Sequence, residues 1–221
     1  MSAMTYEEAV QRITGPGSPF ELVDEDVNGI TMPVFKNRFR SLREVLEKSV
    51  EFGDAELAVW DNGERWSFAG HERIVASVAA ALAEKHGIGK GSRVAILAAN
   101  CPEWILVAWG TIVLGGTVVA MNGWWQGDEI RYGIELGEPD VLFVDRGRLA
   151  RMAGLDVTVE TVVFEEAFAE YVAHAQAAAL PDTDIAEDDC AAPLFTSGTT
   201  GRPQGSMMSH RNFIAFLRTN M

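Results

Sequence analysis

The chain has 221 residues, enough for one domain or one and a half, and its hydrophobic content of 48% argues against wholesale disorder. Its net charge of −14 comes from 32 acidic and 18 basic residues. This charge argues against nucleic acids and anionic membranes as main partners, because both are anionic and bind basic patches. Cys101 and Cys190 lie far apart and outside any histidine cluster, so neither is expected to bind a metal or form a redox pair.

Residues 1–40 are expected to form an N-terminal arm. Residues 5–13 suit a short helix, and the Gly-Pro-Gly-Ser-Pro sequence of 15–19 requires a loop. Two extended segments are expected, at 20–23 and 32–35. The first ten residues lack the apolar segment of a signal peptide, which predicts a cytoplasmic protein.

From Ser41 onward, helices and strands are expected to alternate. Ser41 and Glu44 have the spacing of a capping box at a helix start, and Asn62-Gly63 is a hairpin-turn signal. The alternation predicts an α/β fold with a mainly parallel sheet and helices on both faces. Strands are expected at 57–60, 65–68, 93–98, 117–121, 141–144, 161–164 and 191–195, and helices at 74–85, 102–114, 128–136, 148–152 and 167–179.

Residues 104–121 carry no charge, a length at which a membrane helix must be considered. The Gly115-Gly116 pair divides the run, and the β-branched residues that follow are typical of a buried parallel strand. A buried helix leading into a buried strand is therefore favoured, and no transmembrane segment is expected. Asn100 is expected to cap that helix and Pro102 to occupy its first turn, which favours a helix start over a nucleophile site.

Two further patterns are interpreted as structural. The acidic residues of 181–189 suggest a surface connection whose charges serve solvation. Trp124-Trp125 could form an aromatic platform for a ligand, but such a pair more often fills the edge of a core or a subunit contact.

The most informative stretch is 194–205, Leu-Phe-Thr-Ser-Gly-Thr-Thr-Gly-Arg-Pro-Gln-Gly. Its glycines permit a close backbone approach to a ligand, and its N–H and hydroxyl groups are donors suited to phosphate oxygens. The spacing fits neither a Walker A loop nor GxGxxG. A helix from Ser209 would place a positive dipole end nearby. The order strand, glycine loop, helix predicts a phosphate-binding loop at the carboxyl end of its strand, with Arg202, His210 and Arg211 either supplying a local positive field or simply solvated.

This loop closely resembles the signature loop of the AMP-forming adenylating enzymes, which include acyl-CoA synthetases, luciferases and the adenylation domains of peptide synthetases. The chain departs from that signature at Gln204, where the family has lysine and therefore a mobile positive charge. Segments at 41–43, 91–96, 100–104, 115–119 and 121–130 resemble the same family, the last being most like bacterial fatty acyl-CoA ligases. The resemblance assigns to the phosphate loop Thr196, Ser197, Gly198, Thr199, Thr200, Gly201 and Gln204.

The resemblance implies two half-reactions. A carboxylate, here most simply a fatty acid, attacks the α-phosphate of ATP in the presence of Mg²⁺ to give an acyl-adenylate and pyrophosphate, and a thiol, usually that of coenzyme A (CoA), then displaces AMP. The family's magnesium-binding glutamate and its catalytic lysine, which belongs to a C-terminal lid, come later than residue 221, so no catalytic residue or metal ligand is assigned. Residues 41–221 are expected to be an α/β subdomain of the large N-terminal domain, with the phosphate loop at 194–205 and the lid absent.

Three interpretations of function stay open. The chain is the N-terminal part of an acyl-CoA synthetase that is inactive alone, or a stand-alone nucleotide-binding or interaction protein on a degenerate adenylating fold. The second interpretation is favoured by Gln204 and by the early end of the chain. In the third, the parent enzyme loads an acyl or aminoacyl group onto a carrier protein. Acyl chain length and homo-oligomerisation are left open.

Overall fold

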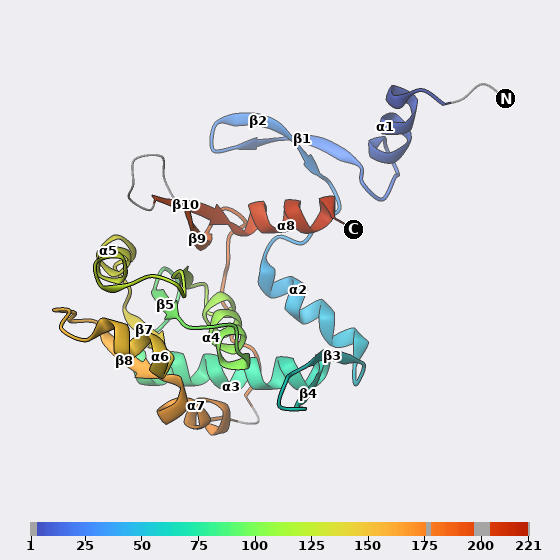
Figure 1. Ribbon diagram of the computed structural model, residues 1–221. Helices are drawn as coiled ribbons and strands as arrows, with labels where there is room; N and C mark the ends of the chain where they lie inside the picture. The colour runs from blue at the N-terminus through green and yellow to red at the C-terminus, as the bar shows by residue number, and fades with distance from the viewer. Residues whose placement is uncertain (1–3, 176–177, 197–203, 221) are drawn as a thin grey trace.

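The structure is a computed structural model that describes residues 4–175, 178–196 and 204–220. Its centre is a sheet of four parallel strands, Arg93–Leu97 (β5), Thr117–Ala120 (β6), Val141–Val144 (β7) and Glu160–Val163 (β8). Their order across the sheet is β6-β5-β7-β8, and Ile96 of β5 lies between Ala120 of β6 and Phe143 of β7 (Figure 1).

Helices cover both faces of this sheet. They are Phe68–His86 (α3), Pro102–Val113 (α4), Gly127–Gly137 (α5), Arg146–Leu149 (α6), the 3-10 helix Ala150–Met152 (η2) and Phe164–Ala173 (α7). Alternate side chains of a strand point to opposite faces. Ile96 and Phe143 therefore pack with α3, α4 and α7, whereas Leu97 and Leu142 pack with α5, α6 and η2. The predicted fold class, a mainly parallel sheet with helices on both faces, is confirmed.

Before α3 the chain forms short helices and two antiparallel hairpins. Their bounds are Tyr6–Thr14 (α1), Leu22–Val27 (β1), Ile30–Phe35 (β2), Leu42–Ser49 (α2), the 3-10 helix Val50–Phe52 (η1), Glu56–Val59 (β3) and Arg65–Ser67 (β4). The hairpin predicted around Asn62-Gly63 is confirmed as β3–β4. The two predicted extended segments pair as β1–β2 through Asn28-Gly29, at φ of 53° and 83°. This turn has the same Asn-Gly signal as the turn at residues 62–63.

The C-terminal part contradicts one prediction. Cys190–Thr196 (β9) pairs antiparallel with Gln204–Ser209 (β10), and helix His210–Thr219 (α8) follows (Figure 1). The helix predicted from Ser209 is confirmed, with Ser209 as its N-cap, but the glycine-rich segment is followed by a strand and not directly by a helix. Residues 204–209 have little strand pattern of their own, so pairing with β9 decides their structure.

Several helix caps and boundaries also differ from prediction, and α3 begins at Phe68, earlier than the expected residue 74. Cys101, not Asn100, is the N-cap of α4, because Pro102 occupies the first helical position as predicted. Ser41 accepts a hydrogen bond from the backbone of Glu44 at 3.2 Å, but the Glu44 carboxylate bonds the backbone of Arg40 and does not complete the capping box. Helix α7 begins at Phe164 and ends at Ala173, earlier at both ends than expected.

The uncharged run 104–121 folds as expected into α4 and β6, where most of its side chains are buried. Among the described residues, no helix is both long and apolar enough to cross a membrane.

Candidate functional site

The predicted phosphate loop is the connection of the β9–β10 hairpin. Ser197, Gly198, Thr199, Thr200 and Gly201, together with Arg202, lie outside the described residues. The two flanking site residues are described: Thr196 ends β9 and Gln204 begins β10. They are partners in the ladder, the Thr196 hydroxyl lies 3.4 Å from the Gln204 carbonyl oxygen, and both side chains are exposed.

The hairpin lies beside β6 without joining the parallel sheet. At the start of β9, the Thr117 hydroxyl donates to the Cys190 carbonyl oxygen at 3.0 Å. At its end, the rings of Phe195 and Trp125 meet with centroids 5.0 Å apart, just beyond the carboxyl end of β6. β9 therefore runs in the same direction as β6. The strand before the loop lies outside the parallel sheet, since in the described part of the chain it pairs only with β10.

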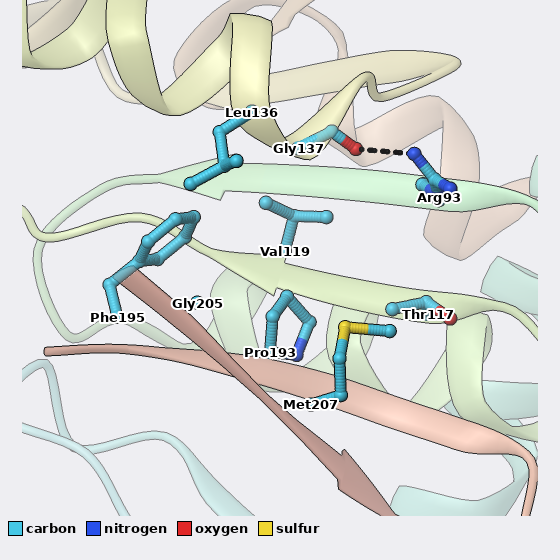
Figure 2. A pocket seen from close by; sticks show the side chains of 9 residues that line it. All are labelled: Arg93, Thr117, Val119, Leu136, Gly137, Pro193, Phe195, Gly205 and Met207. Atoms are coloured by element: carbon cyan, nitrogen blue, oxygen red, sulfur yellow. Dashed lines mark hydrogen bonds between the residues drawn. The ribbon is translucent and has the colours of Figure 1, made fainter. Parts of the chain in front are cut away.

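A cavity of about 140 Å³ separates the hairpin from the sheet (Figure 2). Arg93, its one charged lining residue, donates to the Gly137 carbonyl oxygen at 3.2 Å and pairs with Glu138 at 2.9 Å. Because that guanidinium already has an anionic partner and the other walls are mostly apolar, the cavity has little to offer a phosphate group. Its walls are Arg93, Thr117, Val119, Leu136, Gly137, Pro193, Phe195, Gly205 and Met207.

Neither alternative holds for His210 and Arg211, which are neither solvated nor free to supply a positive field. The His210 ring is fully buried, and its Nδ1 accepts a hydrogen bond from the Leu42 N–H at 3.1 Å. Burial lowers the pKa of His210, while Asp189 opposes that shift, so the ring is neutral near pH 7. Arg211 is paired with Asp188 and Glu187.

The N-terminus of α8 is also remote from the predicted loop. Ser209 is the ladder partner of Cys190, so the helix begins at the base of the hairpin. Because β10 has six residues, this base lies roughly 17 Å from Gln204. A helix dipole acts over about one turn, so the α8 dipole does not reach Gln204.

The two adjacent tryptophans have different environments. Trp125 is 6% exposed and packs in the core beneath Phe195, which confirms the core-edge interpretation for this residue. Trp124 is 80% exposed. The segment that connects β6 to the two tryptophans is fixed at Gly123. The side chains of Arg148 and Arg151 both donate to the Gly123 carbonyl oxygen, at 3.0 and 2.8 Å.

Sequence reasoning missed a group of ion pairs at the base of the hairpin. The acidic connection was expected to be solvated, but the Glu187 side chain is only 8% exposed. The sequence around Glu187 gives little indication of this burial, because the residues that pair with it come from segments remote in sequence. We call the group the hairpin-base cluster; its members are Glu25, Arg38, Arg40, Glu187, Asp188 and Arg211.

Comparison with known proteins places the hairpin within a family domain. The model of the family described as "AMP-binding enzyme" matches residues 46–221, which include β9, β10 and the connection between them. The chain belongs to this AMP-binding enzyme family. Its parallel sheet and hairpin are therefore part of this family's domain.

Named relatives of this AMP-binding chain include ligases that form CoA thioesters. It is 30% identical to 4-coumarate–CoA ligase 2 of Oryza sativa subsp. japonica over 190 residues, which are 76% of this chain and 33% of the relative. It is 34% identical to 3-hydroxybenzoate–CoA/4-hydroxybenzoate–CoA ligase of Thauera aromatica over 141 residues, 58% of this chain and 27% of the relative. The chain thus spans about a third of the length of these relatives.

Solved structures show the same fold. The N-terminal domain of FACL13 from Mycobacterium tuberculosis superposes with a TM-score of 0.69 at 22% identity, over 78% of this chain and 44% of that one. VinN in complex with 3-methylaspartate gives a TM-score of 0.72 at 19% identity, over 81% of this chain and 50% of that one.

Proposed function

We propose that this chain is the N-terminal part of an AMP-forming acid–thiol ligase, which activates a carboxylic acid with ATP and transfers the acyl group to CoA. The observation that carries the proposal is the hydroxyl- and glycine-rich sequence between Thr196 and Gln204, at the tip of a hairpin inside the matched domain. The CoA ligases named above support a thioester as product. They are named for aromatic acids, so a fatty acid substrate rests only on the resemblance of 121–130.

In the proposed reaction, the donors of Thr196, Ser197, Gly198, Thr199, Thr200 and Gly201 hold the β- and γ-phosphates of ATP. A carboxylate oxygen attacks the α-phosphorus, the bond to the β-phosphate oxygen breaks and pyrophosphate leaves. The thiol sulfur then attacks the acyl carbon, its proton is lost and AMP leaves. Positioning and electrostatic stabilisation contribute most of the catalysis. Within the described residues there is no group of three or more candidate metal ligands, so we assign none of them to Mg²⁺.

We propose the domain division 1–40 for the N-terminal arm and 41–221 for the α/β subdomain, and we propose that the catalytic lysine belongs to a lid outside this chain. The purified chain is then expected to show no carboxylate-dependent exchange of labelled pyrophosphate into ATP. The assay should include both fatty and aromatic acids. Exchange above the rate without added acid would contradict the proposal that the chain alone is inactive.

The Gln204 side chain is exposed at the first position of β10, beside the predicted loop. Replacing it by lysine is expected to tighten MgATP binding roughly tenfold, because a hydrogen bond to a charged group is stronger than one from an amide. Calorimetric titration of the purified variants with MgATP measures this. Gln11→Lys in α1, which adds the same charge far from the hairpin, should bind like the unsubstituted chain (Figure 1).

Equal MgATP affinities for Gln204→Lys and the unsubstituted chain would show that position 204 does not contact phosphate. Absence of binding in both would contradict a working phosphate site in this chain. Gln204 also favours the second candidate function, a nucleotide-binding or interaction protein without adenylating activity. Nucleotide binding by the isolated chain, with a native intact mass that ends at Met221, would support that candidate.

A further inference from the structure

The base of the β9–β10 hairpin is joined to the segment before it and to the helix after it. The His210 N–H donates to the Asp189 carbonyl oxygen at 3.1 Å, and the Arg211 N–H donates to that of Glu187 at 2.8 Å. The acidic connection and the first turn of α8 are therefore fixed to one another. A side chain that binds Glu187 therefore restrains both the start of β9 and the end of β10.

Arg38, from the segment after β2, is such a group. Its side chain is 3% exposed and bonds Glu187 through Nε and through Nη2, the latter at 2.9 Å. The same guanidinium donates to Glu25 of β1 at 2.6 Å and to the Phe35 carbonyl oxygen at 2.6 Å. One buried arginine thus joins the β1–β2 hairpin to the start of β9.

The rest of the hairpin-base cluster completes the pairing. Arg40 donates to Glu187 at 2.9 Å, and Arg211 lies 3.1 Å from Glu187 and bonds Asp188. Burial would raise the pKa of Glu187, but hydrogen bonds from Arg38 and Arg40 hold that pKa below its ordinary value. The cluster contains as many arginines as carboxylates, so removing Arg38 leaves the buried Glu187 undercompensated.

A second contact brings the N-terminal arm onto α8. The Arg218 guanidinium lies over the rings of Phe20 and Phe35, 5.0 and 5.8 Å from their centroids, and donates to the Pro19 carbonyl oxygen. The β1–β2 hairpin accordingly lies next to α8 (Figure 1). The arm contacts the hairpin base directly and through α8.

We propose that Arg38 is a positioning residue of the β9–β10 hairpin: held between Glu25 and Glu187, it couples the N-terminal arm to strands β9 and β10, and this coupling supports the binding of MgATP. The effect on ATP rests on the proposed function. The effect on the hairpin rests on the contacts of Arg38 alone.

Hydrogen exchange on the full chain tests the coupling. In Arg38→Met, the β9 and β10 amides are expected to exchange about tenfold faster or more, because losing its most buried partner leaves the charge of Glu187 undercompensated. The amides of β5 and β7 should be unchanged. Arg38→Lys should give an intermediate rate, since an ammonium lacks the planar fork that meets two carboxylates at once. It also serves as the second variant if Arg38→Met does not fold.

Lys36→Met is the matched control, because Lys36 lies in the same segment but pairs with Glu21 and is half exposed. Unchanged exchange in β9 and β10 in both Arg38 variants, or an equal rise in β5 and β7, would overturn the proposal. A double-mutant cycle with Glu187→Gln should show less than additive effects, and additivity would also overturn it.

MgATP titration of the same variants separates the two proposals. Arg38→Met is expected to weaken MgATP binding several-fold and Lys36→Met to leave it unchanged. If the unsubstituted chain does not bind MgATP, the proposed function of the chain fails, while the exchange data still decide whether Arg38 positions the hairpin. Unchanged MgATP affinity despite faster hairpin exchange would overturn the link between the cluster and ATP.

Discussion

Replacing Phe143 by alanine is expected to lower the free energy of unfolding by about 3–5 kcal/mol, because a fully buried aromatic ring is lost and a cavity remains. Phe143 is 0% exposed and lies in β7, next to the central strand β5. Its ring meets those of Phe164 and Tyr171 in α7, with centroids 5.8 and 5.4 Å away, and that of His86 in α3 at 6.2 Å. One side chain therefore joins the sheet to two helices.

Urea denaturation followed by circular dichroism measures the Phe143 effect. Phe216→Ala in α8 is the matched control, since that ring is 65% exposed and its loss should cost less than about 0.5 kcal/mol. Phe143→Leu keeps most of the volume and should fall between the two. Similar midpoints for Phe143→Ala and Phe216→Ala would show that the aromatic group around β7 does not carry the stability of the domain.

The elements around Phe143 could be predicted because their signals are local. β7 is an uninterrupted apolar run, which suits a strand buried on both faces. The strand ends before Asp145, which is the N-cap of α6. Pro102 likewise fixes where α4 begins. These features need only neighbouring residues, so the alternation of strands and helices and the fold class followed from the sequence.

The surroundings of the candidate site were harder to predict because their determinants are distant in sequence. Gln204–Ser209 becomes a strand by pairing with β9, although its own residues barely favour one. Arg38 and Glu187 lie 149 positions apart, so nothing near Glu187 indicates that its charge is buried and paired. A phosphate loop between Thr196 and Gln204 could be proposed from its short sequence pattern, whereas the contacts at the base of the hairpin required the tertiary structure.

His71 of α3 is a buried histidine that has no charged partner among the described residues. It is 4% exposed, its ring stacks on Trp66 at 5.6 Å between centroids, and Trp109 meets it edge-on at 6.2 Å. No hydrogen-bond partner for its Nε2 is found in the described part of the chain. Burial lowers the pKa of His71 to about 4, against about 6.5 in an unfolded chain. The native protein therefore holds this ring neutral at a pH where the unfolded chain protonates it.

Stability should consequently fall as the pH drops from about 6.5 towards 4, by about 2 kcal/mol at pH 5 from His71 alone, because the unfolded state binds the additional proton. The contribution is fully present above pH 6.5. The neutral variants His71→Phe and His71→Gln differ in packing, and hence in stability at pH 7.5, but both should lose this part of the slope. Urea unfolding at pH 7.5 and pH 5.0 measures it. If both variants lose as much stability between these pH values as the unsubstituted chain, His71 is not the group responsible. If only one variant flattens the profile, packing rather than protonation accounts for the change.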